Sequence, residues 1–222
     1  MRQPLFGLLS VRSFSRSTFR FAAIFLALTI NAAAAQAQTR TGSILPSVSQ
    51  PVARVGTAKP MMGWARFCQQ HPTECLVDPT EPAIIELTAK DWQTLNRVNQ
   101  QVNAAIKAKT DNDHWGIEDV WDLAEDGYGD CEDYQLVKRK RLVEAGLPRR
   151  ALRMTVVIDE DGAGHAVMMV RTNRGDFILD NKRNAILPWH QTGYVYIKRE
   201  GAEGLAWASL GGRTSPTMTA NQ

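Results

Sequence analysis

The first 37 residues of this 222-residue chain contain no aspartate or glutamate, and the whole chain has only three cysteines and no apolar run of 20 residues. The missing run argues against a membrane-spanning helix, which needs about 20 apolar residues. Glycine and proline number only 16 and 10, and no internal repeat is visible, which excludes a collagen-like chain. With 44% hydrophobic and 22% charged residues, the sequence can bury a core and is not wholly disordered. Its length suits one domain of ordinary size or two small ones.

The N-terminal segment has the three parts of a secretory signal. Four arginines precede an apolar run at 21–30, and the small-residue sequence Ala35-Gln36-Ala37 follows. We therefore predict a signal peptide over residues 1–37, cleaved between Ala37 and Gln38. An uncleaved anchor and a mitochondrial transit peptide are the alternatives. The block-like apolar run disfavours the second, since transit peptides are amphipathic.

The net charge of +3 belongs to that predicted signal. Its removal takes away four arginines, which leaves 22 basic against 23 acidic residues. The mature chain is then near −1, so the composition indicates no nucleic-acid partner and no stable membrane insertion after processing. The basic run 138–141 spreads around a helix and is expected to be a solvated face rather than a binding patch.

Composition also suggests the domain limits. Residues 38–60 and 201–222 lack apolar periodicity, and we expect a flexible leader and a flexible tail on either side of one domain at 61–200. Helices are predicted at 64–68, from a capping box that starts at Thr88, and from Asp130 through Leu142. Strands are predicted at 152–159, 165–171, 176–179 and 194–198. Helices followed by an antiparallel meander indicate an α+β fold.

The cysteines fall into a pair and a single residue. Cys68 and Cys75 are seven residues apart, and in an exported protein we expect them to form a disulfide. A zinc site with His71 is a weaker alternative because the spacing is unusual. Cys131 is left over. It is either a buried small apolar residue or, because the start of a helix stabilises a thiolate, a nucleophile.

A histidine and an aspartate with matching roles follow downstream. His165 opens one predicted strand and Asp180 closes the next, so antiparallel pairing can place them side by side. A cysteine nucleophile needs a base for its proton, and the imidazole needs an acceptor that holds its tautomer. Cys131, His165 and Asp180 supply these three roles in that chain order.

Residues 60–200 resemble the bacterial transglutaminase-like cysteine proteinases. The resemblance rests on GDCEDY at 129–134, on GHAV at 164–167 and on LDN at 179–181, with WGIEDVW at 115–121 upstream. It implies a papain- and transglutaminase-like core, with Cys131 as nucleophile, His165 as base and Asp180 as orienting acid. It further implies export to the periplasm, release of biofilm cells by cleavage of a large adhesin, and sequestration by an inner-membrane cyclic-di-GMP receptor. The sequence departs from the family at 122–124, which bears on the substrate groove.

The same resemblance implies calcium bound through acidic residues that match Asp130 and Glu132. Together with Asp133 they place up to three negative charges beside a thiol that must ionise. At 5–7 Å and a dielectric near 20, each opposes the thiolate by roughly 2–3 kcal/mol. Hard oxygen ligands suit calcium, which would neutralise the cluster. The alternative is that Asp130 and Asp133 only cap the helix.

These observations lead to three hypotheses. The first is an exported cysteine endopeptidase, periplasmic or secreted, that acts on a surface or periplasmic protein. The second is a transglutaminase or amidase with the same acyl-enzyme but another acceptor. The third is a non-catalytic binding module that retains the fold, and an intact Cys131, His165 and Asp180 set argues against it.

Overall fold

The computed structural model describes residues 44–203 and 206–214. The predicted signal peptide lies outside these residues. The helices are α1 (Met62–Gln70), α2 (Pro72–Cys75), α3 (Ala89–Ala105), α4 (Asp111–Trp115) and α5 (Cys131–Glu144). Among the described residues, none of the helices has both the length and the apolar character needed to cross a bilayer.

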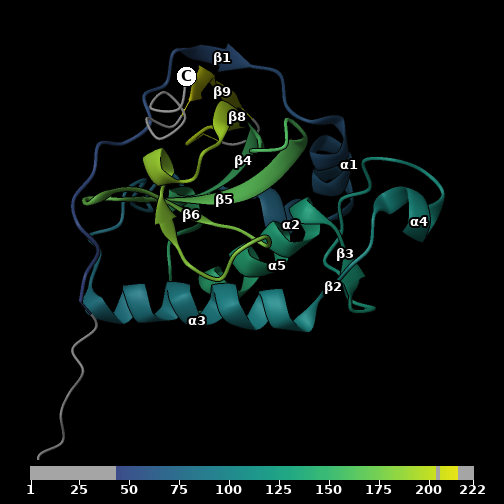
Figure 1. The fold of residues 1–222 in the computed structure, drawn as a ribbon, viewed down its shortest axis with the longest axis horizontal. Coiled ribbons are helices and arrows are strands. Elements are labelled where there is room, and N and C mark those ends of the chain that lie inside the picture. The colour runs from purple at the N-terminus through teal and green to yellow at the C-terminus, as the bar shows by residue number, and fades with distance from the viewer. Residues whose placement is uncertain (1–43, 204–205, 215–222) are drawn as a thin grey trace, which may run out of the picture. The chain divides into compact units, whose positions relative to one another are not determined.

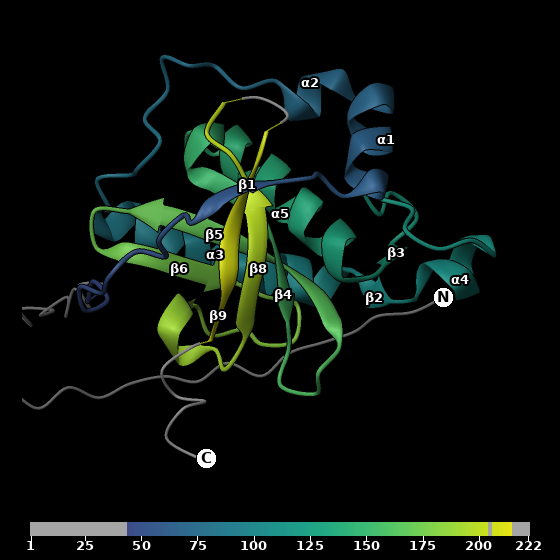
Figure 2. The same cartoon turned by 90° about the horizontal axis from the view of Figure 1, so that it is seen from above.

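The main sheet has seven antiparallel strands in the order β1-β9-β8-β4-β5-β6-β7, and all of them except β1 follow the helices in the chain. Its strands are β1 (Gly56–Ala58), β4 (Leu152–Ile158), β5 (Gly164–Thr172), β6 (Gly175–Leu179), β7 (Leu187–Pro188), β8 (Val195–Glu200) and β9 (Trp207–Thr214). Figure 2 shows β9, β8 and β4 side by side. A small parallel pair, β2 (Lys107–Ala108) and β3 (Tyr128–Gly129), lies apart from this sheet. The predicted α+β fold is confirmed.

Helix α5 is the central helix of the domain. It packs against β4 and β5 on one side and against α3 on the other (Figure 1). The apolar stripe of α3 makes the contact with α5, and its residues Leu95, Val98 and Val102 are buried. The Thr88 capping box predicted for this helix is present, because Thr88 and Asp91 exchange hydrogen bonds with each other's backbone N–H groups.

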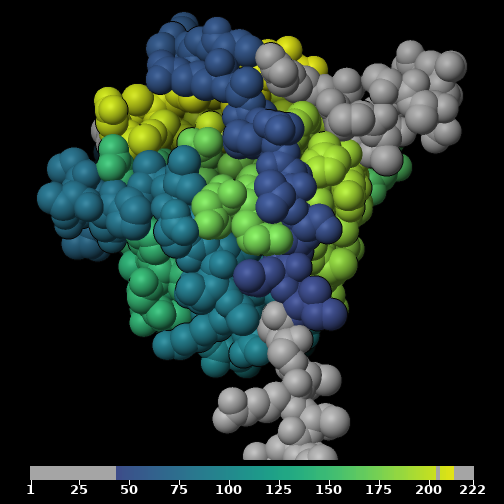
Figure 3. Space-filling model, turned by 90° about the vertical axis from the view of Figure 1, so that its left-hand side faces the viewer, coloured from purple at the N-terminus to yellow at the C-terminus, as the bar shows by residue number. Residues whose placement is uncertain are grey.

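Apolar side chains cover both faces of the sheet. The larger cluster fills the space between the helices and the sheet and includes Trp64, Met154 and Phe177. The smaller cluster, which includes Val52, Tyr196 and Leu210, lies on the opposite face. Figure 3 shows the blue N-terminal segment lying across the green strand residues on that side. Among the hydrogen bonds that hold this segment are two between backbone groups, Ser49 N–H to Arg174 O and Val55 N–H to Ser209 O.

The domain is longer at both ends than the composition indicated. The expected flexible leader contains β1, which pairs with β9, and the expected flexible tail contains β9 itself. The boundaries at 61 and 200 were therefore wrong. Gly211 and Gly212 both have positive φ, and they interrupt the pairing of β9 with β8. This irregularity conceals the strand's alternating pattern in the sequence.

The basic run at 138–141 is solvated only in part, because Lys140 and Arg141 reach the surface whereas Lys138 and Arg139 are buried. The guanidinium of Arg139 is buried and bonds both carboxylate oxygens of Glu200, at 2.8 and 2.7 Å. Lys138 is fully buried, and its Nζ has no hydrogen-bond partner among the described residues. The expectation failed because the sheet and α3 cover α5 on two sides. Lys138 and Arg139 are therefore buried, although a run of basic residues is typical of a surface.

Replacing Lys138 with methionine should stabilise the protein, mainly at low pH. Burial outweighs the attraction of Asp180 and lowers the pKa of Lys138 to about 7. The unfolded chain, with an ordinary lysine pKa of about 10.4, therefore binds the proton more readily, and stability falls as the pH drops from about 10 to 7. We expect Lys138→Met to raise the melting temperature by roughly 2–8 °C at pH 6, and by less at pH 9. Lys140→Met, at a partly exposed position on the same helix, serves as the control, and an equal gain in both variants would contradict the prediction.

Cys68 and Cys75 form the predicted disulfide, with their Cα atoms 5.5 Å apart. The bond ties α1 to α2. His71, the proposed partner in a zinc site, instead stacks on Phe67 with ring centroids 4.8 Å apart.

Loss of this disulfide should destabilise the domain moderately. A crosslink that closes a loop of about eight residues stabilises the fold by roughly 2–3 kcal/mol, because it restricts the unfolded chain. We expect the Cys68→Ser/Cys75→Ser double variant to lower the free energy of unfolding by that amount in urea titration. A reductant should destabilise the wild-type protein equally and leave the double variant unchanged. A double variant as stable as the oxidised wild type would show that the crosslink adds nothing.

Candidate active site

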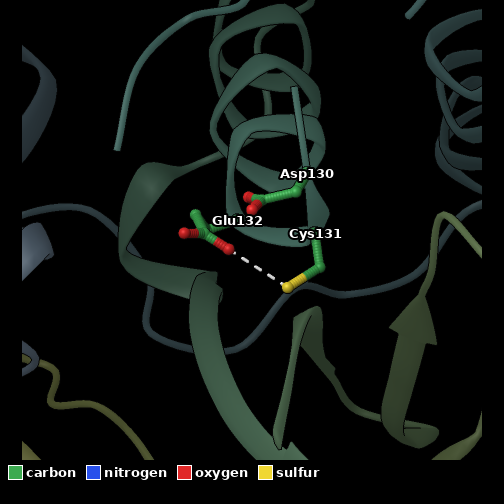
Figure 4. Close-up of side chains that lie close together, drawn as sticks. All are labelled: Asp130, Cys131 and Glu132. Atoms are coloured by element: carbon green, nitrogen blue, oxygen red, sulfur yellow. Dashed lines mark hydrogen bonds between the residues drawn. The ribbon is translucent and has the colours of Figure 1, made fainter. Parts of the chain in front are cut away.

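Cys131 is the first residue of α5 and is partly exposed. Its thiol donates a hydrogen bond to Glu132 Oε2 at 3.1 Å (Figure 4) and accepts one from the Ala166 N–H at 3.4 Å. The second contact places the sulfur beside the start of β5. The predicted helix start at Cys131 is confirmed, and this cysteine has a free thiol.

His165 and Asp180 meet because β5 and β6 are antiparallel neighbours. The register pairs Met168 with Leu179, which puts the first residues of β5 near the end of β6. His165 Nε2 lies 3.0 Å from Asp180 Oδ1, and both side chains are buried. The other oxygen of Asp180 accepts a hydrogen bond from the Tyr194 hydroxyl at 2.6 Å. The aspartate is thus bonded on both oxygens and holds the imidazole in one orientation.

Hydrogen bonding keeps the Asp180 carboxylate ionised. Burial alone would raise its pKa, but the hydrogen bonds from His165, Tyr194 and the Lys182 backbone outweigh burial and lower the pKa to about 2. The ionised Asp180 accepts a hydrogen bond from the imidazole and fixes the orientation of the ring.

The structure brings Cys131 and His165 into one neighbourhood without a hydrogen bond between them. Within the described part of the chain, no hydrogen bond joins the thiol to the imidazole, and the sulfur instead donates to Glu132. Because Nε2 of His165 is bonded to Asp180, Nδ1 is the imidazole nitrogen left for proton exchange. In this arrangement Glu132 therefore competes with His165 for the thiol.

The three predicted acidic residues, together with Cys131 and Asp111, form two overlapping groups of possible metal ligands. One consists of Asp130, Cys131 and Glu132, and the other of Asp111, Asp130 and Asp133. Within each group the ligand atoms lie within 4.8 Å of one another. Asp130 belongs to both, and its Oδ1 is buried without a hydrogen-bond partner among the described residues.

Gly129 allows the second group to form. A Cβ atom at this position would lie 2.8 Å from Asp133 Oδ2. Without it, Asp133 reaches back to accept the Asp130 N–H at 3.2 Å and completes a capping box at the start of α5. Capping and possible metal binding therefore coexist in these residues.

The carboxyl groups around the thiol lie where ionisation is unfavourable. Burial and the neighbouring Asp130 raise the pKa of Glu132, and burial with the charges of Asp122 and Asp130 raises the pKa of Asp133 to about 8. Burial and then the charge of Glu132 raise the pKa of the Cys131 thiol. The raised pKa values indicate that these acidic groups have no nearby positive charge to stabilise their ionised forms. A bound divalent cation would supply that charge.

Two residues of the site were missed in the sequence. Asp111 is buried in α4 and accepts the Val120 N–H at 2.7 Å, and its own N–H donates to Asp130 Oδ2 at 3.3 Å. Tyr194 precedes β8. Asp111 lies in the first turn of a short helix that was not among the predicted elements, and Tyr194 was predicted to begin a strand. Neither has a local pattern that marks a site.

Comparison with known proteins gives the class. The model of the family described as bacterial transglutaminase-like cysteine proteinase matches residues 54–215. The chain therefore belongs to this family, and it is a cysteine peptidase of the transglutaminase-like type. The match begins and ends near β1 and β9, which agrees with the longer domain.

Solved structures of LapG from Legionella pneumophila are similar to this chain. The calcium-bound form is 26% identical, with a TM-score of 0.48, and the match covers 56% of this chain and 72% of that one. The EGTA-treated form is 28% identical, with a TM-score of 0.46, and the match covers 53% of this chain and 67% of that one. No curated protein matches the sequence.

Proposed function

We propose that the protein is an exported cysteine endopeptidase with Cys131 as nucleophile, His165 as general base and Asp180 as the residue that orients the imidazole. The observation that carries this proposal is the buried His165–Asp180 contact of 3.0 Å next to the sulfur of Cys131. A partly exposed thiol at a helix start, with an oriented imidazole nearby, supplies the groups that acyl transfer needs.

The reaction proceeds through an acyl-enzyme. His165 takes the proton of Cys131, and the sulfur attacks the peptide carbonyl carbon to form a tetrahedral intermediate. The C–N bond then breaks as the imidazolium gives its proton to the leaving amine. Water, activated by the neutral imidazole, hydrolyses the thioester and restores the thiol. The backbone N–H of Cys131 at the start of α5 is placed to stabilise the oxyanion.

Calcium fits the acidic residues around the thiol. Asp130 would hold it together with Asp111 and Asp133, or with Glu132, since Asp130 belongs to both groups and has an unpaired buried oxygen. The ion would supply positive charge that offsets these carboxylates. Glu132 must release the thiol before His165 can accept its proton, so the charge on this cluster governs how readily Cys131 ionises.

The substrate that we propose is a surface or periplasmic protein, such as a large adhesin. This follows from the resemblance of GDCEDY and GHAV to proteases of that kind and from the predicted signal peptide, which together imply a periplasmic or secreted enzyme. The same resemblance leads us to propose an inner-membrane cyclic-di-GMP receptor as a partner and a role in biofilm release.

Incubation with exported adhesins of the same organism tests this function. The full chain, with calcium or with EGTA, is mixed with their N-terminal regions and a labelled primary amine, and the products are analysed by mass spectrometry. We expect discrete cleavage with a free carboxylate at the new C-terminus. Incorporation of the amine would instead favour a transglutaminase. No acyl transfer to either acceptor, with any adhesin, would favour a non-catalytic module and contradict the proposal.

A further inference from the structure

A second concentration of charge lies far along the sheet from Cys131, and it is basic. Strands β4, β5 and β8 direct Arg153, Arg171 and Arg199 to one face. The register places Arg153 opposite Met169, two residues before Arg171, and Thr155 opposite Arg199. The three guanidiniums therefore share the sheet face that the N-terminal segment covers.

These arginines line a cavity of about 340 Å³, closed on one side by residues 51–54 of the N-terminal segment. Arg54 contributes a fourth guanidinium to its wall. Val52 fixes the segment here, because its N–H donates to Asp176 Oδ2 at 2.8 Å. The cavity is thus bounded by a sheet and a strap that is hydrogen-bonded to it, and its volume is at the lower end of the range for small-molecule sites.

Carboxylates do not balance this charge. Asp176 is shared by Arg171 and Arg199, at 3.2 and 3.3 Å. Glu200 also lines the cavity, but both of its oxygens are bonded to Arg139 from α5. Five guanidiniums therefore share two carboxylates, which leaves an excess of three positive charges, and among the described residues Arg54 and Arg153 have no carboxylate partner.

The arginines keep donors for a ligand. Arg153 is only 3% exposed, and its guanidinium donates to a backbone oxygen, that of Gly201. Arg54 likewise donates to a backbone oxygen, that of Gly56 at 3.1 Å. Burial and the neighbouring arginines lower the pKa of Arg153 to about 10, although the attraction of Glu200 opposes this. The guanidinium stays protonated at neutral pH, so repulsion between these charges persists unless an anion offsets it.

We propose that this cavity binds a small molecule that carries a phosphate group. Guanidiniums match tetrahedral oxyanions because each presents two parallel N–H donors. A phosphate dianion offsets most of the excess of three charges, whereas a single carboxylate offsets only one. The cavity also leaves space for a small organic group next to the phosphate.

Inorganic phosphate is the probe that tests the site. We expect phosphate to raise the melting temperature of the full chain saturably, by roughly 3–6 °C at ten times its dissociation constant. Sodium chloride at matched ionic strength should give no such shift. Isothermal titration calorimetry or phosphorus NMR then gives the dissociation constant directly.

Three variants locate the binding. Arg171→Gln and Arg54→Gln should each weaken phosphate binding by at least about tenfold, since each removes a charged hydrogen-bond donor. Arg97→Gln, at an exposed position of α3, should bind like the wild type. Because Arg54 is exposed, Arg54→Gln should fold, and it therefore tests the site even if Arg171→Gln does not fold. Equal binding by all proteins, or a shift that chloride reproduces, would overturn the proposal.

Discussion

Cys131→Ala should lower the rate of peptide-bond cleavage by at least about 10³-fold, since the proposed acyl-enzyme forms on the sulfur of Cys131. The fold should persist, because Cys131 is only partly buried and its two hydrogen bonds join neighbours that also have other contacts. The expected change in melting temperature is within about 2 °C. The rate is measured with an adhesin N-terminal region and the melting temperature by calorimetry.

Cys131→Ser separates nucleophilicity from shape. Serine keeps a hydroxyl donor for Glu132 but is a weaker nucleophile at neutral pH, so this variant should also be nearly inactive. Cleavage by the alanine variant at the wild-type rate would contradict the assigned mechanism. Loss of cleavage together with a large fall in melting temperature would point to a structural role for Cys131 instead.

Calcium added to chelator-stripped protein should raise both stability and activity. A cation bound only by the folded state stabilises it by about 2.7 kcal/mol at a hundred times its dissociation constant, which is roughly 5–11 °C in melting temperature. The activity gain has a separate cause. With Asp130 and Glu132 neutralised, the Cys131 thiol ionises more readily, and the rate with calcium should exceed the rate in EGTA by at least about tenfold.

The calcium effect should grow with pH. Because the fold raises the pKa of Asp133 to about 8 and that of Glu132 to about 9, their contribution to the stability of the calcium-free protein is full below about pH 4 and is lost as the pH rises through these values. Calcium binds the ionised carboxylates, so it should stabilise the protein more at pH 8 than at pH 5. Calorimetry at both pH values measures this difference.

Variants of the acidic cluster provide the control. Asp130→Asn should remove most of the response to calcium, whereas Glu125→Gln, on an exposed loop nearby, should leave the response intact. Equal melting temperatures with calcium and with EGTA at pH 8 would exclude binding to these carboxylates.

Local patterns in the sequence were sufficient to predict those parts of the fold that depend on residues close together in the chain. The capping box at Thr88 and the stripe through Leu95 and Val102 predicted α3, because those signals lie within one helix. The Cys68–Cys75 disulfide followed from short spacing. The contact between His165 and Asp180 followed from two strand ends joined by a tight turn.

Features set by distant contacts could not be predicted in this way. β1 and β9 are stabilised mainly by each other and by β8, across about 150 residues of sequence. Asp111 reaches the acidic cluster from a separate short helix, and Tyr194 reaches Asp180 from a loop before β8. The burial of Lys138 and Arg139 depends on what covers α5, which the periodicity of α5 alone does not reveal.

Alkylation of Cys131 by iodoacetamide tests the central claim most directly, because it measures thiolate reactivity at the proposed nucleophile. Mass spectrometry follows the modified fraction of Cys131 with time at pH 7, with calcium and with EGTA, while cleavage is measured in the same samples. We predict rapid modification with calcium, slow modification with EGTA, and loss of cleavage in proportion to the modified fraction. Complete modification of Cys131 in a sample that still cleaves substrate would contradict the account.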